Sequence, residues 1–525
     1  MALAQLGRRE YGDSDQIAFA AYGFSGGLNV KSAPEMVDDA DLTQALNVYL
    51  QADGGVQMRK GYVQSLVVPS GVAPINGLAH LNQQVVAGAP VPVNAALLSQ
   101  SNGNLYVVGL GFNPGPFFLG GAASEPWSAV QVYDPDDPAG ATDVMVICTG
   151  SGGPYVYDGA TLYTPTGWAS VAGAKWCTVV NDILWFGGIP SQPNLVQGMT
   201  IGHPEQLAGY NAFAMSNPVT GLGIVGSGTQ AGLVAGLVTG ISVIYGTAPG
   251  NFSQQDIPSA DGVASGRSMV SYQGVLFYLG RWGFNAFDGV SQPQVLSQKI
   301  EPLIQNTAYP SSSNVVRVFS FKGSRARCFA FLYLNRIYLG YSASGGINDT
   351  YMVLDLTTGG WTIVQMADPT NSAVVLSGPL AQIPEPVLMG SSTGPQVFTF
   401  DVNDPGANTT SDNGAPINAL IRTKFFKVGN PGTAKTLLEL TPEIFASQNL
   451  TMACGVITDY GTTIGEQPLI GTGQSSTSQA YVNPVSRLGF NIQGESFSFA
   501  FQTTDTNPPW LFGGLSGAFY QGARA

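Results

Sequence analysis

Charged side chains are scarce in this sequence. Lys, Arg, Asp and Glu make up 10% of the 525 residues, whereas about 25% is typical of soluble domains. A monomer exposing so few charges would be poorly solvated, so we expect much of the surface to face other protein subunits. The formal net charge of −13 disfavours tight binding to nucleic acid, because that affinity comes mainly from Lys and Arg at the phosphates.

Histidine and paired cysteine are also rare. The two histidines are His80, expected in a strand, and His203, expected in a loop because a proline follows it. Neither accompanies a nucleophile-elbow motif, so a Ser-His-Asp triad is not indicated. The cysteines lack the paired spacing of a zinc site or a disulfide framework, and buried free thiols are expected. They are Cys148, Cys177, Cys328 and Cys454.

Long apolar runs are missing as well. The first ten residues lack the apolar run of a secretory signal, so we expect synthesis in a cytoplasm. The best membrane candidate, residues 230–245, contains three glycines, a threonine and a serine, and falls short of the roughly 18–20 strongly apolar residues of a span. We predict two consecutive buried strands there, because Ile241–Tyr245 is β-branched and aromatic.

Hairpin signals are what the sequence does contain. Residues 153–159 and 283–289 both place alternating aromatic or aliphatic residues before an Asp-Gly pair. Alternation buries one face of a strand, and Asp-Gly supplies the positive φ of a tight turn. A looser copy covers residues 351–361. Units of this kind recurring roughly every 40 residues are typical of propeller blades.

These signals predict an all-β chain in three parts. Residues 1–70 form an N-terminal arm with a short helix within 34–48, and residues 71–405 form a β-propeller-like domain of seven candidate blades. Residues 401–416, rich in Asn, Asp, Thr, Gly and Pro, form the linker. Residues 406–525 form a C-terminal β-sandwich-like domain with an exposed loop over 471–480.

Acidic clusters are the main candidates for chemistry. Paired carboxylates could serve glycoside hydrolysis, and carboxylate oxygens could bind calcium, although no EF-hand pattern is present. Interleaved prolines favour a solvated turn for the first cluster, which comprises Asp134, Asp136, Asp137 and Asp143. The second comprises Asp401, Asp404 and Asp412.

Glycine pairs and basic residues point to no phosphate site. Residues 26–27 and 359–360 lack a Walker lysine and dinucleotide spacing, so we interpret them as turns. The basic residues are scattered, and a face that pairs with a neighbour's acids is favoured over a nucleic-acid footprint. Their local concentrations are Arg8, Arg9, Arg59, Lys60, Lys322, Arg325, Arg327, Lys424 and Lys427. No catalytic, metal or cofactor-binding residue, and no cofactor, is predicted.

Several stretches resemble tail proteins of short-tailed bacteriophages. Residues 24–34 contain a Gly-Gly-Leu-Asn phrase, residues 41–48 match the end of an acidic helix that closes in Asn-Val, and residues 54–61 contain a Gly-x-x-x-Arg-x-Gly pattern. These resemble the opening of the tail nozzle family, also described as tail tubular protein B-like. Two internal segments look similar to the same family: residues 283–301 and 423–435.

The resemblance implies a non-enzymatic virion protein of the tail, assembled in the host bacterial cytoplasm. In this family a propeller-bearing subunit, usually six per ring, attaches below the portal adaptor, near tail fibres or spikes. The ring retains packaged DNA and conducts it during ejection without reading its sequence. The chain is shorter than many nozzle proteins, which leaves room for a stopper or packaged-DNA stabilisation role. A lumen lined by carboxylates would repel the phosphate backbone.

Two other functions stay open at this point. One is a receptor- or glycan-binding propeller of the tail, and the other is a carboxylate-dependent glycosidase or lyase. The aromatic residues that would line sugar pockets in the first are Trp127, Trp168, Trp185 and Trp282.

Overall fold

The structure is a computed structural model dominated by β-strands. It describes residues 16–34, 36–67, 73–86, 89–100, 103–109, 117–118, 127–138, 140, 142–257, 261–307, 318–377, 386–402, 410–429, 432–446, 450–459, 464–471, 488–503 and 509–521. The helical segments are short and lie in the connections between strands. Those whose bounds lie within the described residues are α1 (Glu301–Gln305) and the 3-10 turns η1 (Thr166–Val171), η2 (Gly228–Gln230), η3 (Gly266–Ser268), η4 (Gln298–Ile300) and η5 (Arg325–Arg327).

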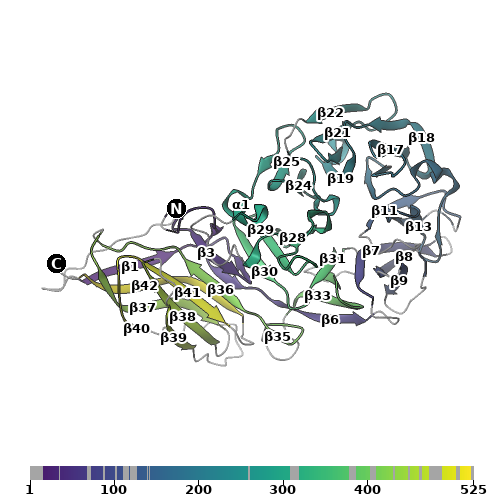
Figure 1. Ribbon diagram of the computed structural model, residues 1–525. Helices are drawn as coiled ribbons and strands as arrows, with labels where there is room; N and C mark the ends of the chain where they lie inside the picture. Colours follow the sequence, from purple (N-terminus) through teal and green to yellow (C-terminus); the bar gives the residue numbers. More distant parts are fainter. Residues whose placement is uncertain are drawn as a thin grey trace.

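Six antiparallel four-stranded units follow one another along the chain and form the first six blades of a propeller (Figure 1). Blades 1 to 3 are β7 (Ile75–Val86), β8 (Ala89–Gln100), β9 (Asn104–Gly109) and β10 (Phe117–Phe118); β11 (Ser128–Asp134), β12 (Thr142–Cys148), β13 (Tyr155–Tyr157) and β14 (Leu162–Tyr163); and β15 (Trp176–Val180), β16 (Ile183–Gly187), β17 (Leu195–Thr200) and β18 (His203–Ala214). Blades 4 to 6 are β19 (Val219–Val225), β20 (Gly232–Leu237), β21 (Ile241–Tyr245) and β22 (Ser253–Ile257); β23 (Val270–Tyr272), β24 (Val275–Leu279), β25 (Phe284–Phe287) and β26 (Gln294–Val295); and β27 (Phe329–Tyr333), β28 (Arg336–Tyr341), β29 (Thr350–Asp355) and β30 (Trp361–Gln365).

The seventh blade closes the ring with a strand from near the start of the chain. It consists of β31 (Thr370–Val375), β32 (Val387–Ser391), β33 (Gln396–Val402) and β6 (Gly61–Val67). β6 pairs antiparallel with β33, with Val67 opposite Gln396. The first strands of successive blades contact one another, and β31 contacts β7, so these strands surround the centre of a closed seven-bladed ring. Closure of this kind leaves only short, protected edges.

A β-sandwich lies beside the propeller (Figure 1). One sheet contains β4 (Val48–Leu50), β5 (Val56–Met58), β42 (Trp510–Gln521), β37 (Lys435–Ala446) and β40 (Leu488–Gly494), with β1 (Gln16–Tyr22) on β42. The other contains β2 (Gly27–Leu28), β3 (Asp41–Leu46), β36 (Ala419–Thr423), β41 (Phe497–Thr503), β38 (Leu450–Thr458) and β39 (Ile464–Gly471). Apolar side chains between the sheets, many of them phenylalanine, form its core.

The sandwich and propeller share one sheet and one core. β2 pairs in parallel with both β3 of the sandwich and β30 of blade 6, which makes a ten-stranded sheet. A single cluster of buried apolar residues continues from Phe501 and Phe512 in the sandwich to Leu279 in blade 5 and Leu339 in blade 6. The all-β prediction of a propeller and a sandwich is therefore confirmed, and the two parts are joined by packing as well as by the chain.

Two local predictions in the arm and linker are wrong. The helix predicted within 34–48 is instead strand β3, because pairing with β2 and β36 outweighs a helical spacing of leucines. The 401–416 linker contains the end of β33 and the short strands β34 (Ser411–Asp412) and β35 (Ala415–Pro416), and β34 pairs with β6. Residues 16–67 form no separate arm, since they supply strands to both the sandwich and blade 7.

The predicted Asp-Gly turns occupy equivalent places in three blades. Asp158, Asp288 and Asp355 each follow or end the third strand, and each carboxylate accepts backbone N–H bonds from the turn toward the fourth strand. The φ angles of Gly159 and Gly289 are 97° and 92°, which confirms the predicted left-handed conformation. The residues of this motif therefore mark one recurring hairpin of the propeller.

The segment over 230–245 contains β20 and β21, which pair antiparallel and are largely buried. The predicted pair of strands is thus confirmed. Among the described residues, no helix combines the length and apolar character that crossing a membrane requires. Gly471 ends β39, and the rest of the loop predicted over 471–480 lies outside the described residues.

Replacing Gly289 with valine should destabilise the propeller by about 1–3 kcal/mol. A Cβ at this position would lie 2.7 Å from the Tyr245 hydroxyl, which itself donates a 2.7 Å hydrogen bond to the Gly289 carbonyl. Chemical denaturation measures the loss. Gly209→Val is the control, because Gly209 has open space and no positive φ, and it should stay within about 0.5 kcal/mol. Equal stability of the two variants would contradict the turn assignment.

Candidate functional site at the junction of propeller and sandwich

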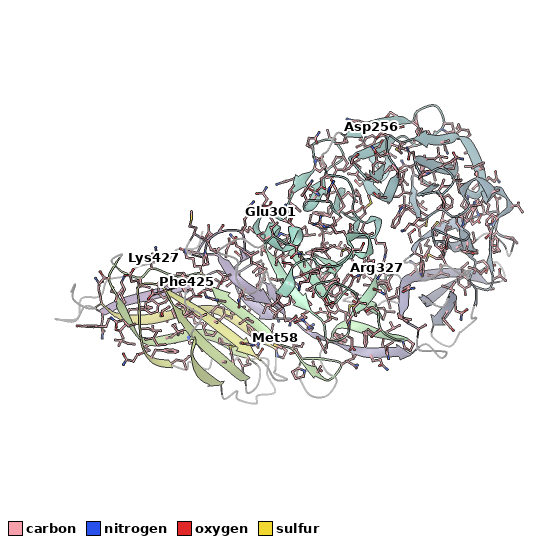
Figure 2. All side chains as sticks on the ribbon, in the orientation of Figure 1. Met58, Asp256, Glu301, Arg327, Phe425 and Lys427 are labelled. Carbon is pink, nitrogen blue, oxygen red and sulfur yellow. The ribbon has the colours of Figure 1, made fainter. Side chains whose placement is uncertain are left out.

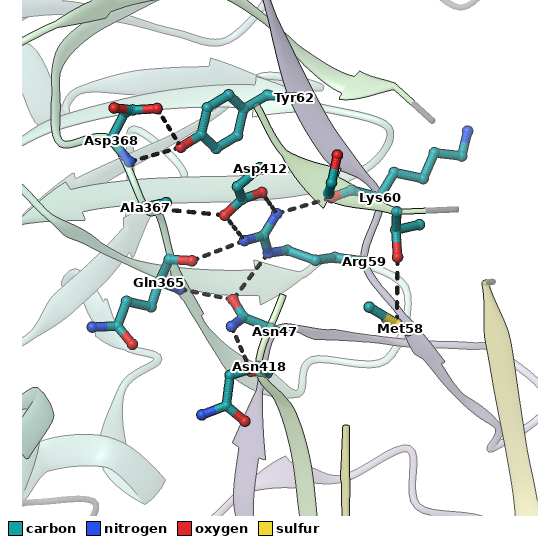
Figure 3. Close-up of polar contacts among 12 residues, drawn as sticks. Asn47, Met58, Arg59, Lys60, Tyr62, Gln365, Ala367, Asp368, Asp412 and Asn418 are labelled. Carbon is teal, nitrogen blue, oxygen red and sulfur yellow. Dashed lines mark hydrogen bonds and ion pairs between the residues drawn. The ribbon is translucent and has the colours of Figure 1, made fainter. Parts of the chain in front are cut away.

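A buried ion pair lies where the sandwich meets blades 6 and 7 (Figure 3). Arg59 and Asp412 form two parallel hydrogen bonds, Nη1 to Oδ1 at 2.7 Å and Nη2 to Oδ2 at 2.5 Å, and Arg59 is fully buried. Its Nε donates to Asn47 Oδ1 at 2.9 Å, and the remaining N–H groups donate to the carbonyls of Lys60 and Gln365. All five guanidinium donors thus have partners.

The surrounding chain supports this pair. Burial alone would lower the pKa of Arg59, but the charge and hydrogen bonds of Asp412 hold it above its ordinary value. Asn47, with a φ of 56°, also accepts the N–H of Gln365 and donates to the carbonyl of Asn418. Sequence reasoning placed Arg59 among basic residues of an interaction face. The structure corrects this, because Arg59 is an internal residue.

A second set of contacts holds β2 between the two halves. Asp41, almost fully buried, accepts bonds from Asn29 Nδ2 at 2.9 Å and from Lys299 Nζ at 2.6 Å. A Cβ on Gly26 would lie 2.0 Å from the Asp41 carboxylate, and one on Gly27, whose φ is +71°, would lie 2.6 Å from the backbone of β30. The glycine pair is therefore required by close packing and not by a phosphate.

Two further ion pairs are partly exposed. Lys31 pairs with Glu301 of α1 across the junction, and Lys424 pairs with Asp39 within the sandwich. The backbone N–H groups of residues 30 and 31 also donate to the carbonyl of Lys299. Figure 2 places Glu301 on the side of the propeller facing the sandwich, far from Asp256 on the outer strand β22 of blade 4.

The segments that carry the family resemblance converge at this junction. They come from positions between residues 24 and 435, yet residues 24–34 and 41–48 both bind residues 295–301, and residues 41–48 also pair with Thr423. Within 283–301, Phe284 packs edge-on against Trp361, whose Nε1 donates to the carbonyl of Leu296. The resembling residues therefore fix how the propeller sits on the sandwich.

Other predicted basic residues are distributed differently. Arg325 donates to the Ile304 carbonyl at 2.6 Å, while Arg327 and Lys427 are exposed. Arg8 and Arg9 lie outside the described residues. Of the predicted set, Arg59 and Lys424 pair with acids of the same chain.

Arg59→Met should lower the free energy of unfolding by about 3–5 kcal/mol, because it leaves a buried carboxylate without its partner. The double variant Arg59→Met/Asp412→Leu should recover most of the loss, since apolar pairs can replace buried ion pairs. Lys31→Met is the control, because an exposed pair contributes about 0–1 kcal/mol. Denaturant midpoints measure all three. If Arg59→Met lowers the free energy of unfolding no more than Lys31→Met does, the ion pair does not stabilise the junction.

The acidic cluster after β11 touches blade 3. Asp136 Oδ2 lies 2.8 Å from Nδ1 of His203 and 2.8 Å from Nε2 of Gln206. His203 is the first residue of β18, which corrects the predicted loop position. These contacts join the turn of blade 2 to the outer strand of blade 3.

Other members of the cluster lie below Asp136, further from the surface. The hydroxyl of Tyr163 lies 3.1 Å from Asp137 Oδ1 and 2.7 Å from Glu205 Oε1. Asp134 is fully buried, with one oxygen accepting the N–H of Asp136. Burial raises the pKa of Asp134 to about 6, assisted by the charges of Glu205 and Asp137. Burial also raises the pKa of Glu205.

Stability should fall as pH rises through the range in which Asp134 ionises. Its pKa is raised in the folded state, so its contribution is complete below about pH 4 and is lost as pH rises past about 6. Melting temperatures of wild type and Asp134→Asn, measured from about pH 4 to pH 7, should therefore diverge in favour of the variant. Asp288→Asn is the control, because turn N–H groups lower the pKa of Asp288, so its contribution changes only as pH falls below about 4 and its profile should parallel wild type at higher pH. Parallel profiles for wild type and Asp134→Asn would contradict this account.

The other predicted acids are separated. Both oxygens of Asp412 bind Arg59. Asp401 lies in β33, where burial raises its pKa and the charges of Lys60 and Arg336 oppose the rise. Asp404 lies outside the described residues. Within the described parts of the chain, no group of three or more His, Cys, Asp or Glu side chains is arranged to hold a metal ion.

Three of the four tryptophans proposed for sugar contact are internal. Trp127, Trp168 and Trp185 are at most 4% exposed, and Trp168 donates to the Pro204 carbonyl at 3.0 Å. Trp282 is 52% exposed, with Arg281 over its ring. The cysteines are buried free thiols, as predicted.

Many carboxylates accept hydrogen bonds from the protein's own backbone. Besides the Asp-Gly turns, Asp53 and Asp459 accept backbone N–H bonds in other turns. The first strands of the seven blades contain no Lys, Arg or Glu, and one Asp, the buried Asp134. The strands around the propeller's own centre are thus nearly uncharged.

No protein-family model matches this chain, and no curated protein matches it. Among solved structures, BBS1N in complex with ARL6DN is similar with a TM-score of 0.41 and 8% identity, over 66% of this chain and 98% of that chain. Hydrazine synthase of Kuenenia stuttgartiensis has a TM-score of 0.39 and 10% identity, over 65% and 99%. These similarities are distant, and the propeller assignment rests on the sheets of this chain.

Proposed function

We propose that this protein is a structural subunit of a bacteriophage tail. In this proposal several copies, six in the family it resembles, form a ring below the portal adaptor that retains packaged DNA and conducts it during ejection. The observation that carries the proposal is the convergence of the family-like segments at one junction. Residues 24–34 and 41–48 bind residues 295–301, residues 41–48 also pair with Thr423, and residues 54–61 contact Phe24 and Asn47.

The junction suits a load-bearing ring subunit. A shared sheet, a continuous core and a fully satisfied buried ion pair fix the propeller against the sandwich. Inter-domain contacts without a large apolar interface ordinarily permit motion. A subunit that must keep its shape while a genome passes would need the rigid arrangement.

The low charge content supports assembly with other subunits. The propeller's own centre is surrounded by nearly uncharged strands, so the proposed DNA path is the axis of the ring and not the centre of one propeller. Carboxylates that repel phosphate there would come from exposed side chains that no turn uses.

Particles that lack this protein should package DNA and then lose it. Nuclease treatment followed by quantitative PCR of protected genomes measures retention. Adding the purified chain should restore protection and build a ring visible by electron microscopy at the portal vertex. Gly209→Val, expected to fold normally, should restore protection equally, whereas Gly289→Val should restore less.

A defect in adsorption to cells would favour the alternative function, a receptor- or glycan-binding component of the tail. If particles without the protein keep their DNA but fail to adsorb to cells, the protein is a receptor-binding component and the ring proposal is wrong. With Trp127, Trp168 and Trp185 buried, such a component would need another contact surface.

A further inference from the structure

A pocket of about 490 Å³ opens where blades 7, 1 and 2 meet. Its volume falls within the roughly 300–1,000 Å³ of small-molecule sites. One wall is the first strand of blade 1, with His80 and Asn82, and the opposite wall is the first two strands of blade 2. The end of β31 closes a third side.

The blade 2 wall carries an alternating set of side chains. Gln131 and Tyr133 are two residues apart on β11 and therefore share a face, and Asp143 of β12 lies directly opposite Tyr133 in the register. Tyr133 is 57% exposed. The wall thus presents an aromatic ring, an amide and a carboxylate side by side above apolar neighbours.

Hydrogen bonds hold the polar groups in fixed orientations. Gln131 Nε2 donates to Asn82 Oδ1 at 2.6 Å, and the backbone N–H of Asn82 donates to Gln131 Oε1 at 3.3 Å. A hydrogen bond between Gln131 and Asp143 opposes the rise that burial imposes on the pKa of Asp143. The Nδ2 group of Asn82 has two donors that these bonds do not use, so the set is pre-organised for a ligand.

His80 completes the polar rim. Its Nδ1 accepts the N–H of Ser377 at 3.4 Å. In the neutral ring this leaves the proton on Nε2, which makes that nitrogen a donor. The lining residues include no Lys or Arg, which disfavours an anionic ligand, and one carboxylate alone is a poor cage for a cation.

We propose that this pocket binds a neutral saccharide. Adjacent sugar hydroxyls both donate and accept hydrogen bonds, and they match a carboxylate acceptor beside the Nδ2 donors of Asn82. The C–H face of a sugar ring is apolar and can pack on the exposed Tyr133 ring. The pocket is separate from the four tryptophans considered from sequence.

Saturation-transfer NMR on the purified full chain tests the proposal, with D-glucose, D-galactose, L-rhamnose and N-acetyl-D-glucosamine as separate probes. At least one sugar should receive saturation. Gln131→Ala and Asp143→Ala should weaken its binding about tenfold or more. Trp282→Ala and Asn217→Ala are controls, because they remove an exposed ring and an exposed amide elsewhere, and they should leave affinity unchanged.

Three results would overturn the proposal: no transfer to any of the four sugars, binding that survives both pocket variants, or binding lost in Trp282→Ala. Calorimetric binding of CaCl2 that disappears in Asp143→Ala would also overturn it, because the pocket would then be a cation site. If Asp143→Ala fails to fold, the exposed Tyr133→Ala replaces it and should weaken sugar binding by the same order. Failure of this test leaves the ring proposal standing, since binding is measured without assembly.

Discussion

Five N–H donors of one buried guanidinium bring four separate stretches of chain together. The donors of Arg59 reach Asp412, Asn47, Gln365 and the adjacent carbonyl of Lys60. A buried charge is tolerated only when its hydrogen-bonding groups all have partners. Movement of any one of these stretches would leave part of the guanidinium unpaired and so destabilise the contacts of the other three. Blade 6, the closing strand of blade 7 and the sandwich are therefore placed relative to one another by a single polar centre, around which the apolar core is continuous.

Patterns between near neighbours in sequence predicted the blades well. The alternation before Asp158 and Asp288 and the β-branched run at Ile241–Tyr245 depend on contacts within one hairpin, so local sequence contains them. The strand β3 and the closure by β6 depend on partners several hundred residues away. No local pattern marks such pairings, which is why residues 34–48 suggested a helix. Asp412 was assigned to a polar linker for the same reason, because its partner Arg59 is distant in sequence.

The acidic composition acquires a different meaning in the folded chain. Several aspartates accept hydrogen bonds from two backbone N–H groups of a turn. Such a carboxylate stabilises the turn whether or not the protein binds a ligand. Others neutralise the few cations, as Asp41 does for Lys299. Net charge is therefore partly a by-product of a turn-rich architecture, and only the remaining exposed acids bear on which partners or polymers approach the surface.

Closure by early strands has a consequence for the chain while it is being synthesised. β1 finds its partner in β42, with Gln16 opposite Tyr520, and β6 finds its partner in β33. The edges of β1 and β6 therefore remain unpaired until the ribosome has synthesised β42 and β33. Pairing between such distant residues slows folding and exposes edges that could pair wrongly with other chains. The propeller and sandwich thus reach their native form together and late in synthesis, when a chaperone would protect the unpaired edges.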